Sequence, residues 1–384
     1  MKKKLLFLLA YFLFSPSAYA QNPAPVPTGV TPLETTAKQA LLLDVTTNAV
    51  LLARNADERM PTSSMSKIMT MYLVFDAIKN EKLKLEDTLP VSEHAWKQPG
   101  SRMFLNAGDR AKVEDLIRGV IVQSGNDSAV VLAEGLSGSE ANFAELMNAK
   151  AKELGMPNSH FKNATGLPDP EHYSTARDLA TLAAAVLRDF PDDYHYYSEL
   201  EFTYNGIKQG NRNPLLYRNI GVDGLKTGHA EEAGYGLIAS SVRDGRRLLL
   251  VINGLKDMQV RADESAKMLD FGYREYGLYP IVKRGEKMAD ATVWLGREAN
   301  VPLVAANDVI LTLPRSVRNG LRVGLNYEQP VQAPIAKGKI LGMVSVFVPG
   351  LNMIEVPLVA GSDVDQLGFL ARFVKKMKLL LGKA

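Results

Sequence analysis

The chain has 384 residues, of which 46% are hydrophobic, so it can bury one large core or two smaller ones. It contains no cysteine, which excludes disulfides, thiol nucleophiles and cysteine-rich metal sites. The formal charge is +3 at pH 7, but removing the three lysines of the first four residues and the five basic residues after residue 365 leaves −5 on residues 21–365. Such a mildly acidic body does not favour nucleic acid as a partner.

Residues 1–20 have the pattern of a secretion signal. Three lysines precede an apolar run from Leu5 to Phe14, and Ala18 and Ala20 supply the small residues of a signal peptidase site. The run is too short to span a bilayer, which makes a transmembrane anchor the weaker interpretation. Residues 21–32 are rich in proline and predict an extended lead-in to the first folded element.

Strand patterns begin and end the next part of the chain, with helical patterns between them. Residues 39–54 predict a β-hairpin, and apolar runs on either side of Asp244-Gly245 predict another. Helices are expected at residues 64–80, 112–136 with a break at 124–126, 140–154, and 175–188 with Ser174 or Thr175 as N-cap. These patterns indicate an α+β domain at residues 33–280, in which the first and last strands of an antiparallel sheet meet and a helical cluster is inserted.

The last hundred residues differ from the preceding part in their pattern of apolar and turn-forming residues. Residues 281–363 contain short β-like runs separated by glycine, proline and asparagine, which predicts a small all-β domain. On a helical wheel, residues 364–384 place nearly all their apolar side chains on one arc and five basic side chains opposite it. This segment therefore predicts an amphipathic helix at a membrane surface, and the alternative is a basic helix packed on its own domain.

Residues 61–70, PTSSMSKIMT, place a lysine among three serines at the start of a predicted helix. Residues three apart share a helix face, so Lys67 should lie over Ser64, while Ser66 points elsewhere and Thr62 and Ser63 are expected to cap the helix. Apolar residues follow on nearly every face, so the helix should be buried, and burial makes a lysine a proton acceptor. The S-x-x-K spacing alone is weak evidence for a catalytic pair, because a surface lysine can occur at the same spacing from a serine.

Two further triplets occur in places suited to a cleft. Ser124-Gly125-Asn126 interrupts two helices, where a loop can direct a hydroxyl and an amide, although an ordinary helix–helix turn is the alternative. Lys226-Thr227-Gly228 lies on a predicted strand, where it offers positive charge, a hydroxyl and room for a substrate backbone to approach, although a strand-end lysine beside a turn is the alternative.

The order S-x-x-K, S-x-N, K-T-G, each on its expected element, is that of β-lactamases and penicillin-binding proteins. With NADERMPTSSMSKIMT, LIRGVIVQSGNDSA, ATGLPDPEHYSTARDLA, NRNPLLYRN and VDGLKTGHAEEAGYGLIAS, the chain resembles the low-molecular-mass penicillin-binding proteins of the D-alanyl-D-alanine carboxypeptidase type. The resemblance includes the β-rich domain and the C-terminus, and implies a β-lactamase/transpeptidase-like fold. It further implies an exported enzyme, peripheral on the periplasmic face of the bacterial inner membrane.

The implied reaction is removal of the terminal D-alanine from a peptidoglycan stem pentapeptide through an acyl-enzyme, with β-lactams as covalent inhibitors and without cofactor or metal. By this resemblance, Ser64 attacks the carbonyl and Lys67 activates it. Ser124 and Lys226 would relay the proton to the leaving D-alanine, and Asn126 would hold the substrate amide.

The resemblance also implies which residues bind the two negatively charged groups, the oxyanion of the reacting carbonyl and the C-terminal carboxylate of the substrate. Backbone N–H groups of Ser64 and His229, the latter directly after Gly228, would form the oxyanion hole. Arg212, with Thr227, would receive the terminal carboxylate, since a guanidinium suits that group. The segment from Arg212 to Lys226 is one residue shorter than the family pattern leads us to expect.

Three alternatives remain open at this point. A serine β-lactamase has the same triplets, but no E-x-x-L-N loop is present to activate a deacylating water. A D,D-endopeptidase needs the same machinery, and a non-catalytic wall-binding or cell-shape protein could keep the fold. Ser-His-Asp chemistry is not favoured, because no G-x-S-x-G elbow occurs, and the five histidines form neither a special spacing nor an H-E-x-x-H zinc pattern.

Overall fold

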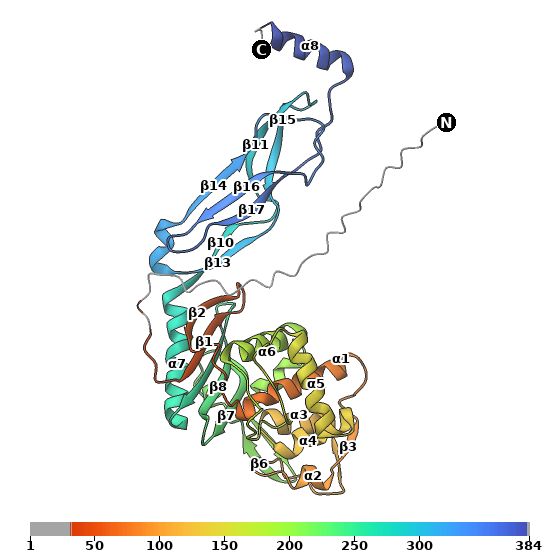
Figure 1. The fold of residues 1–384 in the computed structure, drawn as a ribbon, viewed down its shortest axis with the longest axis vertical. Coiled ribbons are helices and arrows are strands. Elements are labelled where there is room, and N and C mark those ends of the chain that lie inside the picture. The colour runs from red at the N-terminus through yellow and green to blue at the C-terminus, as the bar shows by residue number, and fades with distance from the viewer. Residues whose placement is uncertain (1–30, 32, 382–384) are drawn as a thin grey trace, which may run out of the picture.

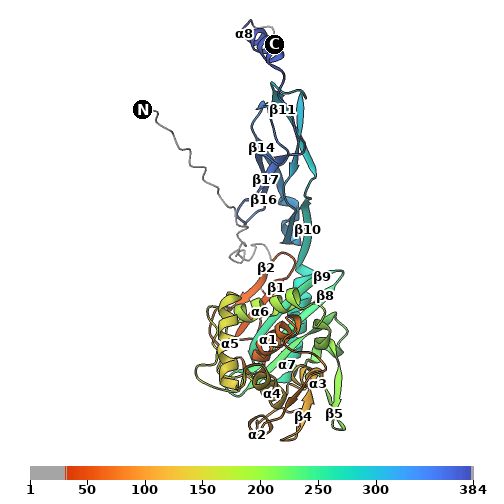
Figure 2. The same ribbon diagram turned by 90° about the vertical axis from the view of Figure 1, so that its right-hand side faces the viewer.

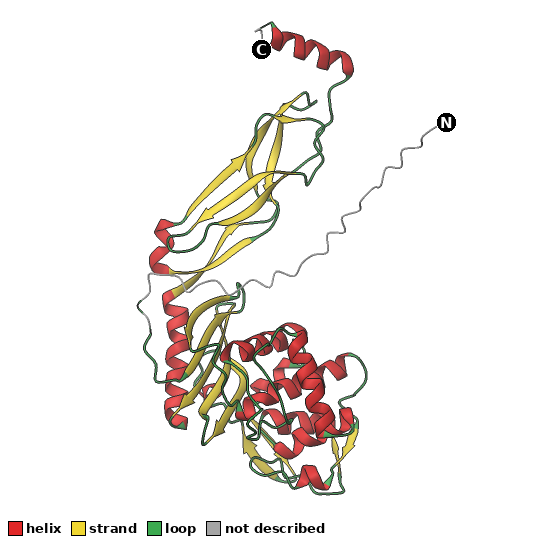
Figure 3. Ribbon diagram, viewed as in Figure 1, coloured by secondary structure: helices red, strands yellow, loops and turns green. Residues whose placement is uncertain are grey.

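The computed structural model describes residue 31 and residues 33–381. The predicted secretion signal, residues 1–20, and nearly all of the lead-in, residues 21–32, lie outside the described residues. Figure 1 shows a lower part that combines a sheet with helices, a narrower upper part made of strands, and a helix at the C-terminal end. Figure 3 shows the same division by type of element, so the predicted α+β fold followed by an all-β domain is confirmed.

The lower part is organised on a five-stranded antiparallel sheet with the order β2-β1-β9-β8-β7. Its strands span Gln39–Asp44 (β1), Ala49–Arg54 (β2), Val222–Ala230 (β7), Gly234–Arg243 (β8) and Arg246–Leu255 (β9). β1 pairs with β9, from Gln39 opposite Asn253 to Asp44 opposite Leu248, so the first and last strands meet as predicted. Asp244 and Gly245 have φ values of 51° and 75° and connect β8 to β9 in a tight hairpin.

Helices occupy both faces of this sheet (Figure 2). The inserted cluster comprises η1 (Ser63–Ser66), α1 (Lys67–Lys79), α2 (Glu93–Trp96), α3 (Val113–Ile121), α4 (Asn126–Ser137), α5 (Glu140–Glu153), α6 (Ala176–Asp189), η2 (Tyr194–Ser198) and η3 (Pro214–Tyr217). The short hairpins are β3 (Thr88–Pro90) with β4 (Arg110–Lys112), and β5 (Glu201–Tyr204) with β6 (Ile207–Gly210). Thr175 caps α6 by accepting the Asp178 N–H, as predicted, and α7 (Met258–Glu275) packs on the other face.

Helix α1 lies at the centre of the cluster because almost all of its faces are apolar. Ile68, Met69, Val74 and Phe75 are fully buried in the largest hydrophobic cluster of the protein, between the sheet and α3, α4 and α6. Strand β7 is the outer strand of the sheet, with β8 on one edge and η1 packed near it. The start of α1 is therefore held against an edge strand.

The upper part is all-β apart from one short 3-10 helix, η4 (Arg315–Gly320). Its strands are β10 (Tyr276–Val282), β11 (Lys287–Trp294), β12 (Asn300–Ala305), β13 (Val309–Pro314), β14 (Arg322–Tyr327), β15 (Val331–Gln332), β16 (Ile340–Phe347) and β17 (Ile354–Ala360). Six form a sheet in the order β14-β16-β17-β12-β11-β15, and β10 pairs with β13. A separate apolar cluster fills the space between them.

A buried ion pair connects the two parts. Asp44 on β1 accepts a hydrogen bond from Arg246 Nε at 2.7 Å and another from the Thr312 hydroxyl on β13 at 2.9 Å. Arg246 also donates to the backbone oxygen of Tyr276, where α7 continues into β10. Because the carboxylate is fully buried and has partners from both parts, it ties the β-rich part to the sheet below it.

The C-terminal helix α8 (Phe369–Leu380) extends away from the β-rich part (Figure 1). Phe369, Leu370 and Phe373 are exposed by 76%, 79% and 59%. On the polar side, Lys375 lies 5.5 Å from the centre of the Trp294 ring. Between residues 33 and 381, no helix is both long enough and apolar enough to cross a membrane.

Candidate active site

The predicted nucleophile lies in a tighter turn than expected. Ser63–Ser66 forms the 3-10 helix η1, and the α-helix begins only at Lys67. Neither Thr62 nor Ser63 caps it, so that prediction is wrong: the Met65 N–H bonds to the Thr62 backbone oxygen instead. The buried Ser63 hydroxyl has no hydrogen-bond partner among the residues that the structure describes.

Ser66 points away from the lysine, as predicted, and anchors the back of the turn. Its hydroxyl lies 2.7 Å from His172 Nε2 and 2.5 Å from the Thr62 hydroxyl. His172 Nδ1 accepts the Lys162 N–H, so Nε2 carries the proton toward Ser66. Burial lowers the pKa of His172 to about 4, which keeps the ring neutral in this arrangement.

Lys67 Nζ lies 3.0 Å from the Ser64 hydroxyl, which confirms that the two side chains meet. The same nitrogen donates to Asn126 Oδ1 at 2.7 Å and to the Thr165 backbone oxygen at 2.5 Å. A neutral amine has two N–H donors and one lone pair. Because two carbonyl oxygens accept both donors, the lone pair is directed to the hydroxyl of Ser64.

The protonation state of Lys67 follows from its burial. The side chain is fully buried, and this burial lowers its pKa from 10.5 to about 7, with Arg212 adding repulsion and Asp127 and Glu140 opposing the shift. Near neutral pH, a large fraction of Lys67 is therefore uncharged. A group with that pKa is suited to taking a proton from a hydroxyl.

Ser124 and Lys226 form a second hydroxyl–lysine pair across the cleft. Lys226 Nζ donates to Ser124 Oγ at 2.8 Å, and the lysine is 2% exposed. Burial lowers the pKa of Lys226 well below its usual range, and Lys67 adds like-charge repulsion. Ser124 has a φ of 60°, a left-handed conformation that is uncommon for serine and that directs its side chain toward β7.

Asn126 is already engaged in two contacts. Its Oδ1 accepts from Lys67, and its Nδ2 donates to the Pro99 backbone oxygen at 2.6 Å. One N–H of the amide remains available for a substrate. The first action of Asn126 in this structure is thus to orient Lys67.

Two glycines allow the surrounding segments to approach the nucleophile. A Cβ on Gly228 would lie 2.9 Å from the Thr62 backbone oxygen, so this glycine accommodates η1, whereas the sequence suggested room for substrate. Gly166 has a φ of 80°, and a Cβ there would lie 1.8 Å from the Ser63 backbone oxygen. The loop at residues 163–167 can therefore bring the Thr165 oxygen to Lys67 only with glycine at position 166.

A cavity of about 350 Å³ opens beside Ser64 and Ser124. Its other lining residues are Ser101, Arg212, Thr227, Gly228, His229, Tyr235, Met258 and Arg261. The structure therefore brings Arg212, Thr227 and His229 together with the two serines, as the sequence predicts. Over the described part of the chain, Arg212 forms no ion pair, so its charge is available to an anion.

Arg261, on α7, is a residue that the sequence reasoning missed. It is 5% exposed, its Nε has no hydrogen-bond partner within the described part of the chain, and burial lowers its pKa to about 10. Its guanidinium lies 5.7 Å from the centre of the Tyr235 ring and lines the same cavity as Arg212. One signal was present: Arg261, Ser265 and Met268 have helical spacing and place a charge on the buried face of α7.

No group of three His, Asp or Glu side chains that could hold a metal ion occurs among the residues described. The reactive groups that the structure brings together are two serine hydroxyls, two buried lysines and two arginines. Such a set can form an ester with an acyl group and bind a carboxylate next to it.

Comparisons with known proteins agree with this chemistry. The family described as D-alanyl-D-alanine carboxypeptidase matches residues 26–256, and the penicillin-binding protein 5 C-terminal domain matches residues 276–366. D-alanyl-D-alanine carboxypeptidase DacC of Escherichia coli K12 is 37% identical over 369 residues, 94% of this chain and 91% of the relative. DacF of Bacillus subtilis is 35% identical, over 97% of this chain and 96% of the relative.

Solved structures give the same result. Penicillin-binding protein 5 from Haemophilus influenzae superposes with a TM-score of 0.77 at 38% identity, over 88% of this chain and all of that one. Penicillin-binding protein 6B from Escherichia coli gives a TM-score of 0.75 at 33% identity, over 88% of this chain and 99% of that one. The protein belongs to the D-alanyl-D-alanine carboxypeptidase family, as a low-molecular-mass penicillin-binding protein.

Proposed function

We propose that this serine D,D-carboxypeptidase removes the terminal D-alanine from peptidoglycan stem pentapeptides through an acyl-enzyme on Ser64, and that penicillins acylate the same serine. The observation that carries the proposal is the position of Lys67 Nζ, 3.0 Å from Ser64 Oγ, with both of its N–H donors directed to carbonyl oxygens. This geometry leaves a lone pair for the hydroxyl proton, which is what nucleophilic catalysis by serine requires.

Acylation begins when Ser64 Oγ attacks the carbonyl carbon between the two D-alanines while Lys67 accepts the hydroxyl proton. The negative charge on the carbonyl oxygen is stabilised by the backbone N–H groups of Ser64 and His229. As the C–N bond breaks, Ser124 and Lys226 relay the proton to the departing D-alanine nitrogen. Water then attacks the ester and regenerates the Ser64 hydroxyl.

The leaving D-alanine carries the carboxylate that distinguishes a carboxypeptidase substrate. Arg212, Arg261 and Thr227 line the cavity on this side of Ser64. A buried guanidinium without a partner is costly, and a bound carboxylate supplies both the charge and the hydrogen-bond acceptors that it lacks. We assign the pair of arginines to that carboxylate, with Thr227 donating a further hydrogen bond.

A β-lactamase needs a group that activates a water molecule to hydrolyse the penicilloyl ester. In the described part of the chain, Ser64 and Lys67 have no hydrogen bond to any carboxylate; the partners of the lysine are Ser64, Asn126 and Thr165. We therefore expect a penicillin adduct that lasts for minutes to hours. Endopeptidase action on cross-links would use the same groups and differ in access.

The remaining parts of the chain suggest where the reaction occurs. We assign residues 1–20 to a cleaved secretion signal, residues 33–280 to the catalytic domain and residues 281–363 to a β-rich spacer. Helix α8 would hold the protein peripherally on the periplasmic face of the inner membrane. This assignment is supported by the exposed apolar face of α8.

The test is D-alanine release from a pentapeptide by the full chain and two variants. Ser64→Ala should lower kcat by about 10⁴-fold or more, as for other serine nucleophiles. The neighbouring variant Ser63→Ala should still release D-alanine, because the Ser63 hydroxyl forms no hydrogen bond with its surroundings. Substantial activity in a folded Ser64→Ala variant would contradict the proposal.

A further inference from the structure

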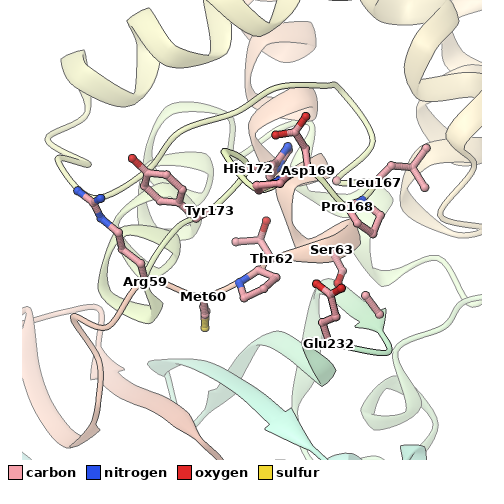
Figure 4. A pocket seen from close by; sticks show the side chains of 14 residues that line it. Arg59, Met60, Thr62, Ser63, Leu167, Pro168, Asp169, His172, Tyr173 and Glu232 are labelled. Atoms are coloured by element: carbon pink, nitrogen blue, oxygen red, sulfur yellow. The ribbon is translucent and has the colours of Figure 1, made fainter.

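A larger cavity lies on the other side of the nucleophile turn. Its volume is about 640 Å³, and it is lined by residues of three segments: 59–63, the loop 166–173, and the end of β7 with the turn that follows it. Figure 4 shows Ser63 and Glu232 at one end of this cavity and Arg59 with Tyr173 at the other. None of the groups that perform the reaction, Ser64, Lys67, Ser124 or Lys226, lines it.

This cavity lies where the residues of a bound peptide before the two D-alanines are expected to extend. The arginine-lined cavity beside Thr227 receives the C-terminal carboxylate in the function proposed above, so the preceding residues leave Ser64 in the opposite direction. Among the described strands, β7 has a partner on one edge only, and an extended peptide can align with its other edge. Since an extended chain advances about 3.3 Å per residue, the residue before the two D-alanines reaches the level of Ala230, which lines the larger cavity.

The charges in this cavity are unpaired. Within the described residues, neither Glu232 nor Arg59 forms an ion pair, and both side chains are exposed to the cavity and to solvent. The Arg59 guanidinium lies over the Tyr173 ring, 4.6 Å from its centre, which fixes the cation without neutralising it. Asp169 is less available, because its Oδ1 accepts the Glu171 N–H.

On the basis of the proposed D,D-carboxypeptidase function, we propose that this cavity binds the part of the stem peptide that precedes the two D-alanines. Glu232, close to the nucleophile turn, pairs with a free ammonium on the side chain of the adjacent diamino residue. Arg59, at the far end, pairs with a carboxylate. That carboxylate belongs either to the same side chain, as in diaminopimelate, or to the γ-linked glutamate before it.

The ammonium is tested by comparing two peptides within each variant. Both end in D-Ala-D-Ala, preceded by lysine with a free side chain in one and by norleucine in the other. D-Alanine release is measured as kcat/KM with the full chain, Glu232→Gln and the matched control Glu231→Gln, whose exposed side chain does not line the cavity. Because the ratio of the two peptides is taken within one variant, a general loss of activity cancels.

The wild-type chain should prefer the lysine peptide by about fivefold, the size expected of a solvent-accessible ion pair. Glu232→Gln should bring the ratio close to one, while Glu231→Gln keeps the preference. A ratio that Glu232→Gln leaves unchanged overturns the ammonium assignment. Equal rates with both peptides in the wild-type chain contradict the subsite alone, whereas no release from either peptide contradicts the proposed carboxypeptidase function.

The carboxylate is tested with Arg59→Gln and two further substrate pairs. In the first pair, the residue before D-Ala-D-Ala is diaminopimelate in one peptide and lysine in the other. In the second pair, the γ-linked D-glutamate has a free α-carboxylate in one peptide and an α-amide in the other. Loss of a wild-type preference in the first pair assigns Arg59 to the side-chain carboxylate, and loss in the second pair assigns it to the glutamate. If Arg59→Gln changes neither ratio, the role of Arg59 is wrong.

Discussion

In the cleft, charged side chains are buried: Lys67 is fully enclosed and Lys226 is 2% exposed. On α8 the opposite holds, since Phe369 and Leu370 are 76% and 79% exposed. Both placements cost free energy in the isolated protein. The cleft recovers part of that cost through hydrogen bonds to Ser64, Asn126 and Ser124 and through the lowered pKa of its lysines. Within the described part of the chain, no segment covers the apolar face of α8. This difference in how the cost is recovered indicates that the cleft is a preorganised site, whereas the apolar face of α8 needs an external partner.

Among the predictions that test this comparison, the largest effect is expected for the buried lysine. Lys67→Arg should lower the rate of acylation by penicillin by about 10³-fold, because arginine keeps its proton and cannot serve as the base. In the wild-type chain, the rate should rise as the pH increases through about 7, where Lys67 loses its proton. Stopped-flow acylation from pH 5 to 9 measures both effects. A Lys67→Arg variant that acylates at the wild-type rate would show that positive charge alone suffices.

The opposite placement, on α8, is tested by membrane binding. Deleting residues 368–384, which contain α8 and leave the pairing of residues 364–367 with the β-rich part intact, should reduce binding to vesicles that contain anionic lipid by about 100-fold or more, since both the apolar face and the basic residues are lost. Co-sedimentation with such vesicles provides the measurement.

Single substitutions on the two faces of α8 give a matched comparison. Phe373→Ser removes an exposed apolar side chain, and Lys376→Ser removes one charge from the basic face. The first should weaken binding at every salt concentration, and the second mainly at low salt. Continued pelleting of the truncated protein with lipid would contradict the membrane role of α8.

A third prediction concerns Arg261, whose buried Nε has no hydrogen-bond partner among the described residues. Arg261→Gln should lower kcat/KM by about 30-fold or more for a peptide with a free C-terminal carboxylate, because that anion loses a desolvated charge partner. The same variant should lose much less with a peptide whose C-terminus is amidated. A matching loss on both peptides would indicate that Arg261 supports α7 and does not contact substrate.

The smallest effect is expected at the back of the nucleophile turn. His172→Ala should lower the free energy of unfolding by about 2 kcal/mol, since it removes one of the two partners of the buried Ser66 hydroxyl and the acceptor of the Lys162 N–H. His195→Ala, at an exposed position, should cost less. Urea denaturation measures both.

The pH dependence of stability gives a second check on His172. Its pKa is about 4 in the folded protein and 6.5 in the unfolded chain, so the unfolded state gains the proton first as the pH falls. The contribution of His172 to stability is therefore complete above pH 6.5 and is lost toward pH 4. A His172→Ala variant whose stability falls as steeply as that of the wild type over this range would contradict the assignment.

Spacing along single elements was sufficient to pair Ser64 with Lys67, and the strand and loop patterns placed Ser124 and Lys226 on the segments that meet. What the sequence could not give depends on contacts between distant segments. The Thr165 oxygen that completes the environment of Lys67 comes from a loop whose approach requires Gly166, and Gly228 proves to accommodate η1. Arg261 is visible as a charge on a buried helix face, but only the packing of α7 beside β8 directs it to the cleft.

The start of α1 shows a further limit of local patterns. Cap residues at positions 62 and 63 favoured an α-helix from residue 64, yet the chain forms a 3-10 turn there, and this turn lies against β7 and the loop 163–167. The order of elements in the α+β domain was predictable, since the apolar residues of its helices and strands form its core. The geometry at the nucleophile was not, because tertiary packing decides it.

The central claim, that Ser64 is a nucleophile held ready by Lys67, is tested most directly by mass spectrometry after mixing the full chain with penicillin. The intact mass is followed over time, and the adduct is located by peptide mapping. We predict one penicilloyl group per chain, on the peptide that contains Ser64, lasting for minutes to hours. An adduct on another residue, or none at all, would contradict the account, and rapid turnover of the adduct would indicate a β-lactamase.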